Sequence, residues 1–180
     1  MSEALVRSAV AACGVEAEWL VCDPELADTA VFCAHYGIDP ADSANTIVVA
    51  GKADPTRFAA CIVLATCRLD VNRTVRQRLG TRKASFATAA ETTRLTGMMI
   101  GGVTAFGLPD DLVIWVDEAV MQRTRIVLGG GSRSWKLLVE PAELLKLPGV
   151  EVVAGLATPI EQITPIEAIS PIEMTDRPSA

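Results

Sequence analysis

Two glycine-rich stretches are the parts of the sequence best suited to chemistry. The segment TGMMIGGVTAFGLP, residues 96–109, contains four glycines and a proline, and LGGGSRS, residues 128–134, contains three consecutive glycines. Each stretch adjoins an apolar segment that is typical of a buried strand. Glycine lets a backbone approach a ligand closely and present its amide groups to it. Turn geometry would also explain these glycines, and composition alone favours that simpler interpretation.

The remaining side chains exclude several common kinds of catalytic site. A Ser-His-Asp triad would have to use His35, the one histidine, which falls in a predicted helix. The chain has no GxxxxGK[ST] phosphate loop, and its five cysteines form no CxxC pair, so neither a metal nor a cofactor is expected. A pocket between the glycine loops would act through shape, backbone amides and a positioned water. Hydrolysis of an activated ester, such as the aminoacyl ester at a tRNA end, fits these means.

A local cluster of positive charge could bind the phosphates of such a substrate. The net charge of −6 disfavours general nucleic-acid binding, yet residues 68–83 hold six of the sixteen basic residues and one acid. A helix predicted over residues 70–80 would bury one apolar stripe and turn its basic face to water. An ordinary solvated face is the alternative, in which case the partner would be a protein, and taken alone it is the better explanation. The candidate tRNA-binding residues are Arg73, Arg76, Arg82 and Lys83.

The order of apolar and turn-forming segments predicts an α/β fold with about seven strands. Strands are expected at residues 16–23, 45–52, 57–67, 83–87, 112–117 and 150–154, with a hairpin over residues 125–141. Short helices are expected at residues 3–13, 24–36, 70–80, 88–97 and 141–147. Because hairpins and helices are interspersed, we expect a curled mixed sheet with short helices at its periphery.

The length of the chain predicts one domain followed by a tail. Residues 1–157 are expected to form the domain, whereas residues 158–180 repeat TPIEQI, TPIEAI and SPIEMT. A proline every six residues prevents one long helix, so we expect an extended or loosely ordered tail that could mediate self-association. The longest wholly apolar run, residues 59–65, is too short to cross a bilayer, and the N-terminus has no basic leader. A cytoplasmic location is therefore expected.

The order of motifs resembles the YbaK/prolyl-tRNA synthetase-associated domain family. The resemblance runs from ATCRLDVNRTVRQRLGTRKASFATAAETTRLTG through TGMMIGGVTAFGLP and VIWVDEAVM to IVLGGGSRSWKLLVEPAELLKL. It covers roughly residues 16–156, which is nearly everything except the tail. The resemblance implies a curled mixed sheet with peripheral helices. It also implies trans-editing, in which a free-standing deacylase hydrolyses the ester of a mischarged tRNA.

The resemblance further implies which residues form the substrate site. The amino acid would lie between the two glycine loops, and the backbone amides of Gly101 and Gly102 would stabilise the oxyanion. The strand-end aspartate of the family falls on Asp117, which would bind the amino group or simply cap its strand. The substrate-binding residues implied in this way are Val103, Thr104, Gly107, Asp117, Gly129, Gly130, Gly131 and Ser132.

Two positions depart from the family pattern. Active members usually carry a lysine at the start of the second strand, where this chain has Asn45. An amide can orient the ester or the terminal phosphate, but it carries no charge. Lys52 lies seven residues further on, on the opposite face of a regular strand, and Ala105 replaces the proline that usually ends the glycine loop. The alternative to a deacylase is a non-catalytic module that binds an aminoacyl group or a tRNA end without hydrolysis.

Overall fold

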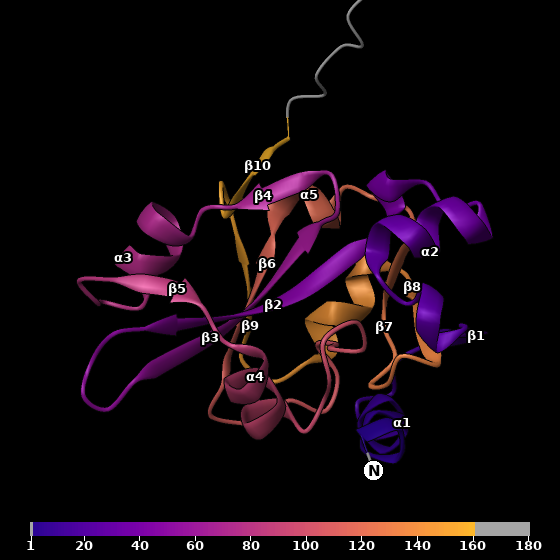
Figure 1. The fold of residues 1–180 in the computed structure, drawn as a ribbon, viewed down its shortest axis with the longest axis horizontal. Helices are drawn as coiled ribbons and strands as arrows, with labels where there is room; N and C mark the ends of the chain where they lie inside the picture. Colours follow the sequence, from indigo (N-terminus) through magenta and orange to yellow (C-terminus); the bar gives the residue numbers. More distant parts are fainter. Residues whose placement is uncertain (1, 161–180) are drawn as a thin grey trace, which may run out of the picture.

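The computed structural model describes residues 2–160, which fold around a five-stranded mixed sheet (Figure 1). Its strands, in spatial order, are β5 (Ala84–Phe86), β2 (Ala44–Gly51), β3 (Arg57–Leu64), β6 (Val113–Asp117) and β9 (Val150–Val153). β2 is antiparallel to β3 and β5, whereas β6 is parallel to β3 and β9. This pairing confirms the predicted α/β class with a mixed sheet.

Two smaller sheets complete the strands. A three-stranded antiparallel sheet has the order β1 (Ala17–Val21), β8 (Trp135–Val139) and β7 (Ile126–Gly129), which confirms the predicted hairpin. β4 (Cys67–Leu69) pairs with β10 (Ala157–Pro159). The strand expected over residues 57–67 therefore breaks at a turn before β4. β10 includes Thr158 and Pro159 of the expected tail, and residues 161–180 lie outside the described part of the chain.

β3 is buried on both faces, as its unbroken apolar run predicted. Ile62 packs into a core that contains Phe106 and Leu128, whereas Cys61 faces a second core that contains Val75. The central sheet therefore separates two hydrophobic layers. Burial raises the pKa of the Cys61 thiol to about 12. This thiol is consequently a protonated core group, in keeping with the prediction of reduced core cysteines.

Short helices surround the sheets. They are α1 (Ser2–Ala12), α2 (Thr29–Tyr36), the π-helical turn η3 (Val71–Val75), α3 (Arg76–Arg78), α4 (Ala89–Thr96) and α5 (Glu118–Met121). Three 3₁₀ turns, η1 (Pro24–Leu26), η2 (Pro40–Asp42) and η4 (Pro141–Lys146), join them. Within residues 2–160, no helix combines the length and the apolarity that a membrane crossing requires.

Local hydrogen bonds explain where these helices begin. The capping box predicted from Thr88 and Glu91 is present, with both reciprocal bonds formed at the start of α4. Asp70 accepts hydrogen bonds from the backbone N–H groups of Arg73 and Thr74, but the turn that it caps is π-helical rather than α-helical. The helix expected over residues 24–36 splits, because Asp28 adopts an extended conformation between η1 and α2. α5 was not predicted.

α1 packs against both glycine-rich loops. A Cβ atom on Gly131 would lie 2.6 Å from Cγ2 of Val6, and one on Gly107 would lie 3.3 Å from Cγ of Leu5. Both glycines also have positive φ angles, of 87° and 78°. These two glycines therefore serve the docking of α1 as well as the shape of their loops.

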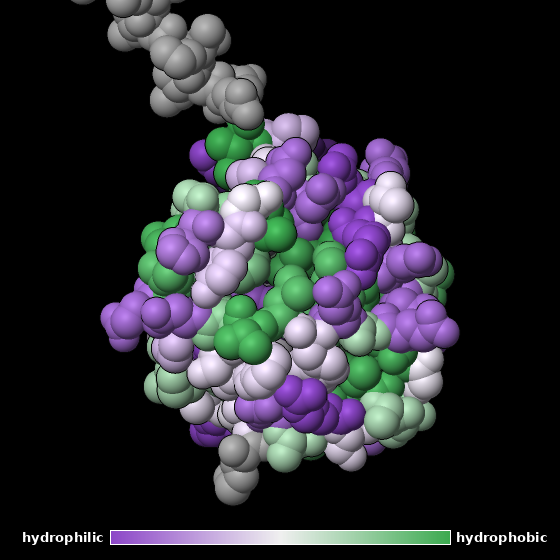
Figure 2. Space-filling view, turned by 90° about the vertical axis from the view of Figure 1, so that its right-hand side faces the viewer, coloured by the Kyte–Doolittle hydropathy of each residue, from purple (hydrophilic) through white to green (hydrophobic). Residues whose placement is uncertain are grey.

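The face that carries α2 and β1 has a mixed surface. Figure 2 shows apolar patches there that are interrupted by hydrophilic residues. Among the exposed apolar side chains, Val21 belongs to β1 and Val31 to α2. This face is therefore not uniformly apolar.

Candidate functional site

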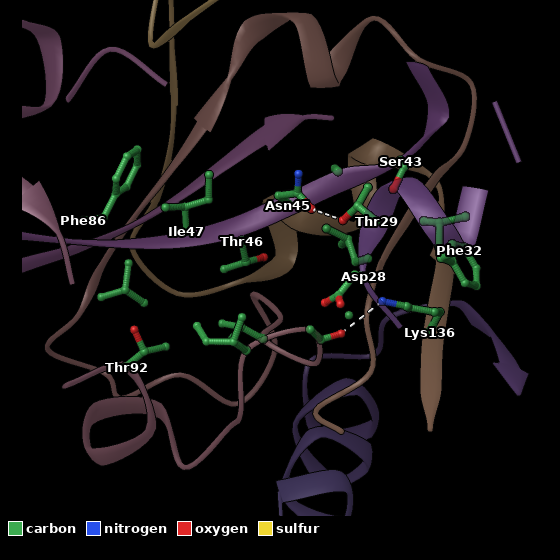
Figure 3. A pocket seen from close by; sticks show the side chains of 18 of the residues that line it. Asp28, Thr29, Phe32, Ser43, Asn45, Thr46, Ile47, Phe86, Thr92 and Lys136 are labelled. Carbon is green, nitrogen blue, oxygen red and sulfur yellow. Dashed lines mark hydrogen bonds between the residues drawn. The ribbon is translucent and has the colours of Figure 1, made fainter. Parts of the chain in front are cut away.

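A pocket of about 350 Å³ opens at the edge of β2 (Figure 3). Two strands neighbour this edge of β2. β5 pairs with β2 only as far as Phe86, which lies opposite Val49. β7 meets the chain just before β2, through a β-bridge between Val127 and Ser43. On this side of β2, residues 44–48 therefore lie in the gap between two neighbouring strands. The pocket occupies that gap and reaches the first glycine loop, α2 and β8.

The alternation of side chains along β2 divides the pocket into two halves. Ile47 packs against the core that contains Val75, and Figure 3 shows Asn45 and Ile47 pointing to one side of β2 and Thr46 to the other. Phe86 is the register partner of Val49 and shares the side of Asn45 and Ile47. We call these halves the Asn45 side and the Thr46 side. A ligand that fills the pocket crosses the strand edge.

The two glycine loops meet, as expected, but they leave no gap between them. The Gly131 N–H donates to the Gly102 carbonyl at 2.8 Å. A Cβ atom on Gly102 would lie 2.6 Å from the Ser132 carbonyl carbon, and one on Gly129 would lie 2.8 Å from the Gly102 carbonyl carbon. The loops are thus packed backbone to backbone. An amino acid cannot lie between them, and the pocket lies beside their contact instead.

Three of the predicted loop residues line the pocket, namely Gly101, Val103 and Gly129. The Gly102 N–H is already bonded to the Met99 carbonyl at 3.0 Å, which leaves it unavailable to an oxyanion. For the Gly101 N–H, no hydrogen-bond partner is found within residues 2–160. The remaining predicted loop residues, which do not line the pocket, are Gly102, Thr104, Gly107, Gly130, Gly131 and Ser132.

Asp117 is a buried cap and does not line the pocket. Its side chain is 2 % exposed and accepts hydrogen bonds from the Ala119 N–H at 3.1 Å and the Ala157 N–H at 2.9 Å. The first bond caps α5, and the second holds the start of β10. Of the two roles considered for Asp117, the structure provides the contacts of the strand-end cap.

Asn45 lines the pocket near the start of β2. Its Oδ1 accepts a hydrogen bond of 2.7 Å from the Thr29 hydroxyl (Figure 3). This bond orients the amide and leaves the NH₂ group as the available donor. Lys52, at the other end of β2, is exposed and does not line the pocket.

Thr46 is a pocket residue that the sequence did not single out. Its hydroxyl is buried without a hydrogen-bond partner among the described residues. Its backbone also faces the open edge, because the Val48 carbonyl two residues away bonds to the Ala87 N–H on that side. A ligand in the gap would therefore meet both the hydroxyl and the backbone N–H of Thr46.

Lys136 is a second pocket residue that the sequence did not single out. It lies on β8, is 6 % exposed, and donates hydrogen bonds to the carbonyls of Ala27 at 2.7 Å and Gly101 at 3.0 Å. An ammonium group has three donors, so one remains for a ligand. Desolvation lowers the pKa of Lys136. The available signal was one lysine inside the apolar segment WKLLV, directly after the glycine run.

Asp28 supplies the carboxylate of the pocket. Arg133 donates to Asp28 Oδ1 at 3.1 Å, and to the carbonyls of Pro24 at 2.8 Å and Ile100 at 3.3 Å. The hydrogen bond and charge of Arg133 lower the pKa of Asp28, so the carboxylate stays ionised near neutral pH. The pocket therefore holds both an anion and a cation, Asp28 and Lys136.

The four predicted tRNA-binding residues lie outside the pocket. Arg73, Arg82 and Lys83 are exposed, and Arg76 is half-buried, with its guanidinium bonded to the carbonyls of Asn72 and Arg82. Lys83 directly precedes β5, whose last residue, Phe86, lines the pocket. Arg82 and Lys83 thus lie just before the end of β5 that is farther from the pocket. Across residues 2–160, no group of three side chains suited to holding a metal ion is found.

Comparison with known proteins identifies the family. The family model for the aminoacyl-tRNA editing domain matches residues 23–147, well over half of the chain. The crystal structure of hypothetical protein APE2540 is 25 % identical, with a TM-score of 0.76, and the match covers 86 % of this chain and 99 % of that one. A candidate trans-editing enzyme for prolyl-tRNA synthetase is 23 % identical, with a TM-score of 0.73 and coverages of 85 % and 95 %. The latter likeness concerns the fold alone. Since the family model spans every element around the pocket, the chain belongs to the aminoacyl-tRNA editing domain family.

Proposed function

We propose that this protein is a trans-editing deacylase that hydrolyses the ester of a mischarged tRNA. The observation that carries the proposal is the buried ammonium group of Lys136, held against Gly101 in a pocket that opens at the edge of β2. Membership of the editing-domain family and the described role of one structural neighbour support the same reaction class.

The two halves of the pocket suit the two parts of an aminoacyl ester. On the Thr46 side, the aminoacyl group would extend toward Val103 and Gly129, with its ammonium group near the Asp28 carboxylate. On the Asn45 side, the Asn45 NH₂ group would orient the ribose or the terminal phosphate. The ester bond would then lie at the strand edge, next to the Thr46 backbone.

Hydrolysis at this position would rely on water as the nucleophile. The water oxygen bonds to the ester carbonyl carbon, the bond from that carbon to the ribose oxygen breaks, and the water proton passes to the departing ribose oxygen. The neighbouring ribose hydroxyl can relay that proton. The oxyanion would accept hydrogen bonds from Lys136 and the Thr46 N–H, with the Gly101 N–H available as a further donor. Fixed donors of this kind are the main source of catalysis in a pocket without a side-chain nucleophile.

Lys136 would supply the positive charge that Asn45 lacks. Its ammonium group is held by two carbonyl oxygens, so it needs little rearrangement when charge develops on the substrate. The position differs from that of the family lysine, because Lys136 comes from β8 rather than from the start of β2.

A non-catalytic binding module is the second candidate function. One observation favours it: the Gly102 amide, which was expected to stabilise the oxyanion, is already bonded within its own loop. Such a module would bind an aminoacyl group or a tRNA end and release it unchanged.

Deacylation of a panel of mischarged tRNAs distinguishes the two functions. We expect the wild-type protein to hydrolyse at least one of them, and Asn45→Ala to lower the rate. If the wild-type protein binds these tRNAs without hydrolysing any, and Asn45→Lys creates hydrolysis, the binding module is the correct function. If it neither binds nor hydrolyses them, both are wrong.

A further inference from the structure

Phe86 is an exposed aromatic residue at the mouth of the pocket. It is 58 % exposed, whereas the other three phenylalanines are buried or half-buried. It lines the pocket on the Asn45 side, and Figure 3 places it at the end of the pocket opposite Lys136. An exposed aromatic ring beside a pocket offers a flat face on which a nucleobase can stack.

The surroundings of Phe86 on this side of the sheet are basic. The apolar residues Val71 and Val75 of η3 pack on the same face of the sheet as Val49, the register partner of Phe86. The basic segment around η3 and α3 therefore covers the side of the sheet to which Phe86 belongs. Lys83 precedes Phe86 by three residues, which corresponds to about 10 Å along a strand.

The Arg76 guanidinium lies 3.4 Å from the Arg82 carbonyl oxygen, so Arg76 also lies at the Lys83 end of β5. The nearby carboxylate of Glu91 is engaged with Thr88 in the capping box of α4. Positive charge therefore lies at one end of β5. The exposed ring of Phe86 lies at the other end, next to the pocket.

We propose that Phe86 stacks on the terminal nucleobase of the tRNA, and that the preceding nucleotides run along β5 toward Lys83, Arg82 and Arg76. The inference rests on the proposed function, because the aminoacyl ester in the pocket determines which end of the RNA meets Phe86. About 13 Å of strand separates Asn45 from Val49, the partner of Phe86, which suits a nucleoside and its ester. Stacking on an aromatic ring tolerates any base, so Phe86 would contribute affinity rather than discrimination between tRNAs.

Binding of an uncharged single-stranded RNA that ends in CCA tests the stacking directly. Phe86→Ala should weaken binding about 10-fold or more, whereas Phe86→Tyr should preserve it. An RNA whose terminal nucleotide lacks its base should bind the wild-type protein as weakly as the intact RNA binds Phe86→Ala. Combining both changes should add no further loss. Additive losses, or an unchanged affinity in Phe86→Ala, would overturn the proposal.

The phosphate contacts have their own readout. Replacing Lys83 or Arg82 by Gln should lower the slope of log affinity against log salt by about 0.7 for each lost phosphate contact on a single strand. Arg125→Gln is the matched control, because Arg125 is an exposed arginine paired with Glu18 on β1. If the salt dependence of binding had the same slope in all three variants and the wild type, the RNA would not run along β5.

The same variants separate this inference from the deacylase. If the protein hydrolyses no ester but its binding of CCA RNA depends on Phe86 as described, the stacking proposal is supported and the proposed deacylase is wrong. If, at limiting substrate, wild type and Phe86→Ala hydrolyse mischarged tRNA equally well, the proposed deacylase is supported and the stacking proposal is wrong.

Discussion

The ammonium group of Lys136 lies 3.0 Å from the carbonyl oxygen of Gly101, to which it donates a hydrogen bond. This contact joins β8 to the first glycine loop at one end of the pocket. It places a buried positive charge next to a loop whose glycines were expected to act through their amides alone. The electrostatics of the pocket therefore depend on a residue of the hairpin as well as on the loop.

The charge of Lys136 should give the reaction an alkaline limit. Burial lowers its pKa below the usual 10.5. We expect deacylation, after subtraction of uncatalysed hydrolysis, to decline as pH rises through that lowered pKa. Lys136→Arg keeps its charge to higher pH, so its residual activity should not show this decline. The same alkaline decline in both proteins would assign the titration to another group.

The same pKa shift predicts how stability responds to pH. Between the lowered pKa and 10.5, the unfolded chain holds a proton on Lys136 that the folded protein has lost. The contribution of Lys136 to the free energy of unfolding should therefore rise with pH across this window. Chemical denaturation of the wild type and Lys136→Met at several alkaline pH values measures it. The contribution is the difference between the two proteins, and a difference that falls with pH would contradict the prediction.

Gly129→Ala should destabilise the fold severely. Its added methyl group would collide with the Val103 carbonyl oxygen and lie 2.8 Å from the Gly102 carbonyl carbon. Because these are backbone atoms, a side-chain rotamer change cannot relieve the clash. We expect a loss of about 3 kcal/mol or more in the free energy of unfolding. Gly14→Ala is the control: Gly14 has a φ of 62° but open space around it, so backbone strain alone should cost about 1 kcal/mol. Equal losses in the two variants would argue against close packing of the loops.

Asp117→Asn should affect stability rather than substrate binding. The asparagine can keep one of the two backbone hydrogen bonds, but its NH₂ group opposes the other N–H. We expect a loss of about 1–3 kcal/mol in the free energy of unfolding. KM should be unchanged under conditions where the variant is folded. A raised KM with undiminished stability would instead support the amino-group role implied by the family resemblance.

Asp28→Asn should weaken binding of the aminoacyl group. The Asp28 carboxylate is the one acidic side chain that lines the pocket, and a charge-assisted hydrogen bond to an ammonium group contributes about 1.5–3 kcal/mol. We therefore expect KM to rise by about 10-fold or more, with a smaller change in kcat. Asp110→Asn, at an exposed position away from the pocket, is the control. An unchanged KM would exclude Asp28 from substrate binding.

Local patterns predicted the elements that frame the pocket. The unbroken apolar run around Cys61 indicated a strand buried on both faces, and the hairpin followed from two apolar strands around the glycine run. Thr88 and Glu91 predicted the start of α4 through their spacing. In each case the pattern that carries the information lies within one short stretch of the sequence, even where the contacts that bury the element come from distant segments.

The features that escaped prediction depend on contacts between distant segments. Lys136 becomes a pocket residue only because β8 brings it to Gly101, which is 35 residues away. The close packing of Gly102 against Ser132 likewise joins segments whose distance no local pattern specifies. The gap at the edge of β2 arises from where β5 ends and where β7 begins its contact. The family resemblance implied that both loops belong to the site, and residues of both line the pocket, but it did not indicate which of their atoms are free.

The most direct test of the proposed deacylase is a single-turnover rate on the mischarged tRNA that the protein hydrolyses best. Wild type should be compared with Lys136→Met and with Lys146→Met, a control lysine that bonds to Gly14 and Glu143 outside the pocket. We expect Lys136→Met to slow release of the amino acid by about 100-fold or more, and Lys146→Met to leave the rate unchanged. Equal rates for Lys136→Met and wild type, with both proteins folded, would contradict a pocket that works through this buried charge.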